Sequence, residues 1–219
     1  MSGATALLAQ DVSIAAETVT LPGLLRMPVA ARGLVLFAHG SGSSRFSPRN
    51  TLVANILGRA KFATLLFDLL TPKEEQIDSE TRKLRFDIAL LTERLVDATR
   101  WALLQPWIKK LPLGYFGAST GAAAALAAAA RMPEVSAVVS RGGRPDLAGA
   151  ALADVQAATL LIVGGADREV LELNRQALAQ LRCEARLEVV PHATHLFEEP
   201  GKLDIVADLA AKWFLRHLH

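Results

Sequence analysis

The sequence predicts an α/β fold built on a mostly parallel, doubly wound sheet. Two observations favour this class: short runs recur along the chain, most of them nearly continuous in apolar residues, and segments with helical spacing lie between them. Strands buried on both faces of a parallel sheet have such continuous apolar runs. Alternation of strands and helices is typical of a doubly wound sheet. The predicted strands cover residues 34–38, 63–67, 113–117, 137–140, 159–163 and 186–190.

Three segments between or after these strands have apolar residues three or four positions apart, the spacing of one helix face. The three stripes are Leu84, Ile88, Leu91, Leu95 and Ala98; Val170, Leu173, Ala177 and Leu181; and Val206, Leu209, Trp213 and His217. Before the first buried strand, residues 11–27 are expected to form one or two antiparallel edge strands.

Two connections bear on access to a site. The connection between Ser140 and Thr159 is too short for a lid of several helices, so we expect no large lid domain and an open site. The connection over residues 70–85 is long and charged. Loops of this length are often functional, and the alternative is a solvated surface excursion.

Length and composition restrict the class of protein. The chain has 219 residues, of which 51% are hydrophobic and 21% charged, so we expect a single globular domain over residues 1–219. The formal net charge is only +2 and no stripe of Lys and Arg is interleaved with aromatic residues, so no nucleic-acid partner is expected. Proline and a glycine-rich turn interrupt the longest apolar run, so no membrane association is expected either.

The residues also indicate a compartment and a ligand class. Cys183 is the single cysteine, and the first residues lack a basic segment followed by an apolar one, so a cytoplasmic location is expected. No Cys/His cluster has the spacing of zinc ligands, so we expect neither metal nor cofactor. The expected partner is a small-molecule substrate, and the expected state is a monomer or a homodimer.

The nucleophile motif G-x-S-x-G occurs as GASTG at residues 117–121. In this motif the serine lies on a sharp turn from a strand to a helix, and the glycines permit close backbone approach. A predicted strand directly precedes the motif and an alanine-rich helix directly follows it. This context favours Ser119 as a catalytic nucleophile over an ordinary glycine-rich turn.

The order Ser, then Asp, then His along the chain predicts the other two members of a triad. Asp167 follows the strand at residues 159–163, where a helix N-cap is its alternative role. Asp146, after the preceding strand, is the runner-up acid. His195 has enough loop before it to reach back over Ser119, whereas His192 directly follows the last strand and is expected at the rim of the pocket.

Backbone amides are needed for the oxyanion that develops in acyl transfer. One is expected from Thr120, and the other from Gly40 or Ser41 in the glycine-rich loop after the first buried strand. That loop lacks the phosphate-binding patterns of nucleotide sites. Four arginines follow strands at the edge where this architecture places ligands, and each is a candidate for an anionic substrate group. They are Arg45, Arg49, Arg141 and Arg144, with Arg45, Arg141 and His192 as the possible substrate-binding residues.

These motifs together resemble a known family. HGSG at residues 39–42, GASTG at 117–121, GGAD at 164–167 and ATH at 193–195 resemble the small, lidless α/β-hydrolases of the dienelactone hydrolase type. SRGGRPD at residues 140–146 and HLFEEPG at 195–201 are similar to a bacterial branch of that family, and the likeness covers roughly residues 33–218. The resemblance implies an α/β-hydrolase fold and a hydrolase. Similar members are sometimes attached to a phosphoribosyltransferase domain.

Two positions depart from true dienelactone hydrolases, which have a cysteine nucleophile where this chain has Ser119 and a glutamate where it has His39. The sequence therefore predicts a serine-nucleophile branch that cleaves carboxylic esters, either small, soluble acyl esters or lactones. Acyl transfer and phosphotriester hydrolysis are alternatives on the same triad. A non-catalytic ligand-binding protein is a third alternative, because fold does not fix function.

Overall fold

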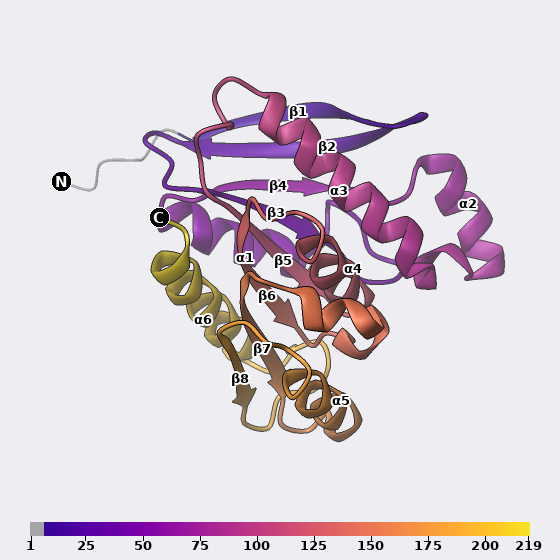
Figure 1. Cartoon of the computed structure of the whole chain (residues 1–219), viewed down its shortest axis with the longest axis vertical. Coiled ribbons are helices and arrows are strands. Elements are labelled where there is room, and N and C mark those ends of the chain that lie inside the picture. The colour runs from indigo at the N-terminus through magenta and orange to yellow at the C-terminus, as the bar shows by residue number, and fades with distance from the viewer. Residues whose placement is uncertain (1–6) are drawn as a thin grey trace.

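A computed structural model describes residues 7–219 as an eight-stranded sheet with helices on both faces (Figure 1). The strand order is β1-β2-β4-β3-β5-β6-β7-β8, and every pair from β4 to β8 is parallel. The fold is that of an α/β-hydrolase, as predicted. The strands are β1 (Leu7–Ala16), β2 (Val19–Pro28), β3 (Leu34–Ala38), β4 (Ala63–Phe67), β5 (Leu113–Ala118), β6 (Val135–Arg141), β7 (Ala158–Gly164) and β8 (Ala185–Val190).

The first two strands form an antiparallel hairpin at one edge of the sheet, where β2 also pairs antiparallel with β4. This confirms the expectation of antiparallel edge strands before the first buried strand. The hairpin turns at Glu17 and Thr18, and the Pro22-Gly23 pair lies inside β2. Glycine at position 23 avoids a tight contact inside the strand, because a Cβ there would lie only 3.0 Å from a methyl group of Val12.

The helices divide into two layers, each with its own apolar core. On one face, α1 (Pro48–Arg59) packs against α6 (Lys202–His217), and their core includes Leu57 and Phe214. The other face carries α3 (Ile88–Leu104), α4 (Thr120–Ala129) and α5 (Arg168–Leu178). The sheet is therefore doubly wound, because its central strands are buried from both sides.

Two helix boundaries differ from the sequence expectation. The stripe that starts at Leu84 is broken: residues Leu84–Phe86 form a separate 3-10 turn, and α3 begins at Ile88. The break is at Asp87, whose side chain accepts a hydrogen bond from the Leu90 amide (3.0 Å) and caps the new helix. Leu181, the last residue of the second stripe, lies beyond the end of α5.

The two connections of interest both contain helical turns. Residues 70–85 contain α2 (Pro72–Thr81), whose first turn has a capping box between Thr71 and Glu74. The connection between β6 and β7 consists of short 3-10 turns over Pro145–Asp154, kinked at Gly149. Within residues 7–219, this connection adds no large lid over the sheet. In the same range, no helix is both long enough and apolar enough to cross a bilayer.

Candidate active site

The candidate residues lie at the carboxyl ends of five parallel strands. Ser119 follows β5, Arg141 ends β6, Asp167 follows β7, and His195 lies in the loop after β8. The loop after β3 carries Gly40 and Ser41. Because parallel strands end at one edge of the sheet, these loops meet there.

Ser119 occupies a sharp turn between β5 and α4. Its φ of 51° and ψ of −122° are rarely adopted by a residue with a side chain. Gly121 permits this turn to pack against the neighbouring strand, since a Cβ there would lie 2.2 Å from the carbonyl oxygen of Ala38. The backbone thus holds Ser119 at the N-terminus of α4, where the helix dipole favours developing negative charge.

Asp167 and His195 form a direct hydrogen bond. The distance between Nδ1 of His195 and Oδ2 of Asp167 is 2.7 Å. Asp167 stands at the N-cap position of α5, but its side chain makes no capping hydrogen bond. The carboxylate is therefore directed to the imidazole rather than to the helix. After His195, the fully buried ring of Phe197 fixes the loop to the protein core.

The loop after β3 lies against the nucleophile turn. A Cβ on Gly40 would lie 3.1 Å from both the Ala118 carbonyl oxygen and the Cβ of Ser119. The hydroxyl groups of Ser41 and Thr120 are hydrogen-bonded at 3.0 Å. This bond connects the two backbone segments from which oxyanion donors are expected.

His39 anchors the start of the same loop. The Leu69 amide donates to Nε2 of His39 (3.1 Å), so the ring proton is on Nδ1, which donates to the Gly40 carbonyl oxygen (3.0 Å). Burial lowers the pKa of His39 below its ordinary value, although the Gly40 carbonyl and the Asp68 carboxylate act in the opposite direction. The imidazole is therefore a neutral link between the ends of β3 and β4.

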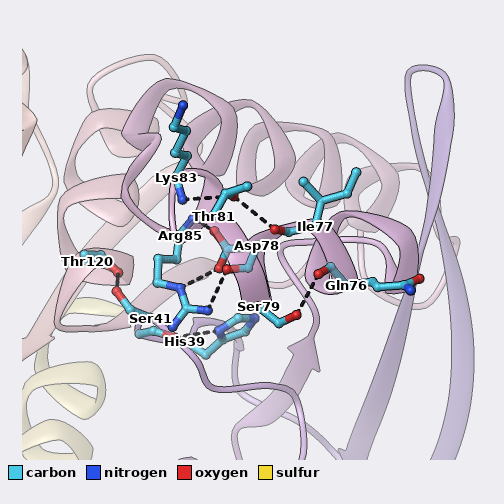
Figure 2. A network of polar contacts seen from close by, with 11 residues as sticks. His39, Ser41, Gln76, Ile77, Asp78, Ser79, Thr81, Lys83, Arg85 and Thr120 are labelled. Carbon is cyan, nitrogen blue, oxygen red and sulfur yellow. Dashed lines mark hydrogen bonds and ion pairs between the residues drawn. The ribbon is translucent and has the colours of Figure 1, made fainter.

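A buried ion pair within residues 70–85 lies against the loop after β3. Asp78 is fully buried, accepts a hydrogen bond from the Arg85 amide (3.0 Å) and pairs with the Arg85 guanidinium. Figure 2 shows this pair beside His39 and Ser41. A Cβ on Gly42 would lie 3.2 Å from Nη1 of Arg85, so the guanidinium is in close contact with the loop. Residues 70–85 therefore pack against the loop after β3 and are not simply a solvated surface loop.

Ser119 and His195 line one pocket of about 180 Å³. Its other lining residues are Gly40, Ser41, Ser43, Arg49, Ala118, Arg141 and Leu196. A second hollow of about 600 Å³ adjoins it and shares Ser41, Ser43 and Arg49.

Four residues that the sequence singled out lie away from the pocket of Ser119. Arg45 pairs with Asp68 at the wall of the larger hollow. His192 is exposed, in a turn where its φ is 61°, and it does not line that pocket. Asp146, the runner-up acid, accepts two hydrogen bonds from the Arg144 guanidinium, at 2.9 and 2.7 Å.

The sequence matches a family of known hydrolases. The pattern that defines the dienelactone hydrolase family matches residues 50–217. The chain belongs to the dienelactone hydrolase family. A solved dienelactone hydrolase from Anabaena variabilis is 57% identical, with a TM-score of 0.96, and the match covers 97% of this chain and 99% of that chain. Membership of this family supports a hydrolase.

Two further comparisons concern the fold and the length of similar proteins. A dienelactone hydrolase-like promiscuous phosphotriesterase from metagenomic libraries has the same fold, with a TM-score of 0.80 at 16% identity over 98% of this chain and all of that chain. Two Mycobacterium tuberculosis proteins named "Putative phosphoribosyl transferase" are 58% identical over 210 residues. These residues are 95% of this chain but 46% of each relative, so the chain spans about half the length of the curated relatives it matches.

Sequence reasoning missed the pair of Asp78 and Arg85. Both lie in a run of charged residues, which is usually a solvated face, and the apolar pattern gives no sign that Asp78 is buried. The capping box at Thr71 and Glu74 was a readable signal that residues 70–85 contain a helix.

Proposed function

We propose that the protein is a serine esterase that uses Ser119, His195 and Asp167 as a catalytic triad. The observation that carries the proposal is the 2.7 Å hydrogen bond from His195 to an Asp167 carboxylate that does not cap its own helix. A helix-capping role would have directed that carboxylate to backbone amides. The common pocket of His195 and Ser119 supports the same assignment.

The reaction begins with attack of the Ser119 hydroxyl oxygen on the ester carbonyl carbon. His195 accepts the hydroxyl proton at Nε2, while its Nδ1–H remains bonded to Asp167. The carboxylate thereby orients the imidazole and stabilises the imidazolium that forms. The Thr120 amide and one amide from Gly40 or Ser41 would donate to the carbonyl oxygen as it becomes negative.

Collapse of the tetrahedral intermediate breaks the bond to the alcohol, which leaves with the proton held by His195. The remaining acyl group is attached to the Ser119 oxygen. A water molecule then gives a proton to His195 while its oxygen attacks the acyl carbonyl carbon. Collapse of this second tetrahedral intermediate breaks the bond to the Ser119 oxygen, which takes the proton back from His195, and the carboxylic acid is released. Since the described chain places no large lid over the site, small and soluble esters or lactones are the proposed substrates.

The test is hydrolysis of short p-nitrophenyl esters by the wild type and two matched serine variants. Ser119→Ala is expected to lower kcat at least 10³-fold, because a triad without its nucleophile loses most of its rate enhancement. Ser136→Ala is the control, since Ser136 is exposed on β6 away from the pocket. Near-normal turnover by a folded Ser119→Ala protein would refute the proposed function.

A further inference from the structure

The loop after β3, from which one oxyanion donor is expected, is enclosed between two other parts of the chain. The nucleophile turn lies against its first residues, since a Cβ on Gly40 would lie 3.1 Å from the Cβ of Ser119. The connection between β4 and α3 lies against its far end, since a Cβ on Gly42 would lie 3.2 Å from Nη1 of Arg85. The loop backbone therefore has Arg85 as its support on the side of that connection.

Arg85 does not reach the reacting atoms. It is absent from the wall of the 180 Å³ pocket that Ser119 and His195 share. It lines a separate cavity of only about 10 Å³, whose other walls include Gly40, Ser41, Gly42 and Thr120. This volume is close to the minimum for one water molecule, so a substrate cannot enter. Any effect of Arg85 on the reaction is therefore exerted through the loop, which makes it a candidate positioning residue rather than a catalytic one.

Asp78 fixes the orientation of the Arg85 guanidinium. Nε of Arg85 donates to Oδ2 of Asp78, and Nη2 donates to the Asp78 carbonyl oxygen at 3.2 Å. The third nitrogen, Nη1, is the one that lies against Gly42. Asp78 is fully buried, so water does not screen this pair as it screens a surface ion pair (Figure 2). The guanidinium is thus held in one orientation, with Nη1 against the loop.

The connection that carries this pair is attached to the rest of the fold at two other points. In the first turn of α2, Oε1 of Glu74 accepts a hydrogen bond from Nη2 of Arg94 at 2.9 Å, which joins α2 to α3. At the start of the connection, the Leu69 amide donates to Nε2 of His39 at 3.1 Å. The ion pair therefore lies on an anchored segment, and its contact with the loop is not that of a free surface side chain.

We propose that Arg85 is a positioning residue of the esterase: held by Asp78, it fixes the loop backbone at residues 40–42 where an amide can donate to the substrate carbonyl oxygen as that oxygen becomes negative. The inference rests on the proposed function, because it concerns the oxyanion donors of that same site. Such a donor is effective at about 2.7–3.1 Å from the developing oxyanion, and loss of one donor lowers kcat about 10²- to 10³-fold. A loop without its support keeps the donor but misplaces it, so we expect a smaller loss of about 10- to 100-fold.

The first experiment compares Arg85→Met with a matched control in the hydrolysis of p-nitrophenyl acetate. Lys83→Met is the control, because Lys83 is exposed in the same connection and also carries one positive charge. Arg85→Met is expected to lower kcat and kcat/KM equally, by about 10- to 100-fold, since the donor acts in the transition state. Arg85→Lys should fall between Arg85→Met and the wild type, because lysine keeps the charge but not the planar fork. Lys83→Met should match the wild type.

An inhibitor that mimics the tetrahedral intermediate distinguishes positioning from a loss of folded protein. A trifluoromethyl ketone forms a hemiketal with the Ser119 oxygen, and its former carbonyl oxygen then occupies the oxyanion position. Its inhibition constant is expected to rise in Arg85→Met by the same factor by which kcat falls. Partial unfolding would lower the amount of active enzyme and leave the inhibition constant unchanged. If Arg85→Met does not fold, the double variant Asp78→Asn with Arg85→Met avoids an unpaired buried charge and takes its place in both measurements.

Hydrogen exchange of the loop amides gives a readout that needs no turnover. In the Ser119→Ala background, peptides covering residues 39–43 should exchange faster with Arg85→Met than with Lys83→Met. If they do and the wild type hydrolyses no p-nitrophenyl ester, the support of the loop stands and the esterase proposal falls. If the wild type hydrolyses these esters but Arg85→Met, or the double variant, keeps the wild-type kcat and inhibition constant, the inference is wrong. Equal exchange in the two variants would also overturn it.

Discussion

Replacing Asp167 with asparagine tests the hydrogen bond on which the proposed mechanism depends. Asparagine has the same shape, so Nδ1 of His195 keeps a neighbour at a distance close to the present 2.7 Å. If the asparagine oxygen faces Nδ1, the negative charge that stabilises the imidazolium is lost. If the asparagine NH₂ faces it, the amide donates to Nδ1 and leaves the proton on Nε2, which can then no longer accept the Ser119 proton.

The expected loss of activity is large. The corresponding change in serine proteases lowers kcat about 10⁴-fold. At 1.36 kcal/mol for each factor of ten, this equals about 5.4 kcal/mol of lost transition-state stabilisation. The effect on folding should be much smaller, because the Asp167 side chain does not cap α5 and its replacement is isosteric. We expect the free energy of unfolding to change by less than about 1–2 kcal/mol, the scale of one hydrogen bond.

The assay is kcat for p-nitrophenyl acetate, with urea unfolding measured on the same preparation. Asp146→Asn is the matched control, since Asp146 bonds to Arg144 and does not line the Ser119 pocket. We expect its kcat within about tenfold of the wild type, the scale of 1.4 kcal/mol. A stable Asp167→Asn protein that keeps more than a tenth of its activity, or a larger loss in Asp146→Asn, would refute the reasoning.

Four substitutions at other positions have outcomes that can be measured. His195→Ala should abolish turnover of p-nitrophenyl acetate, while His192→Ala should change kcat/KM by at most about tenfold, since His192 is exposed; the opposite pattern would exchange the two assignments. Asp78→Asn should lower the free energy of unfolding, measured in urea, by about 3 kcal/mol, because it leaves the Arg85 charge without its buried partner. An unchanged midpoint of urea unfolding would contradict a stabilising role of that pair. Arg141→Met should raise the free energy of unfolding of the ligand-free protein by about 1–3 kcal/mol, because it removes a buried charge that has no ion pair within residues 7–219. Thermal unfolding at a lower temperature than the wild type would contradict this.

The Asp78 pair also predicts how stability depends on pH. Burial raises the pKa of Asp78, but hydrogen bonds from the amide and guanidinium of Arg85 outweigh it and hold that pKa below its ordinary value. The pair therefore stabilises the fold above the pKa of the unfolded chain, and the contribution is lost as pH falls towards the lowered folded value. Urea titrations from neutral pH to about pH 3 should show a smaller loss of stability in Asp78→Asn than in the wild type. Equal losses in the two proteins would contradict this origin.

The strands could be predicted from the sequence because burial on both faces leaves a local signature. The runs at Leu34–Ala38 and Ala63–Phe67 match β3 and β4 at both ends. β6 begins earlier than predicted, at Val135, because exposed Ser136 interrupts the apolar run without ending the strand. The helix break before Ile88 was not predicted, because Leu84 continues the apolar spacing and the capping by Asp87 is a matter of backbone geometry.

The site was predictable only in part, for a similar reason. Strand ends in a parallel sheet meet at one edge, so the sequence indicates which loops come together. It cannot indicate that Arg141 is buried with no counterion among residues 7–219 or that the Asp167 side chain does not cap its helix, because both depend on residues distant in the chain.

The most direct test of the central claim is the site of reaction with a fluorophosphonate. The probe phosphonylates a serine only when that oxygen is activated as a nucleophile. Peptide mass spectrometry of the labelled protein should find the adduct on Ser119, and labelling should remove ester hydrolysis in proportion. Labelling of Asp167→Asn should be slower than that of the wild type. An enzyme that hydrolyses esters while Ser119 stays unlabelled, or an adduct on another residue that tracks the loss of activity, would contradict the account.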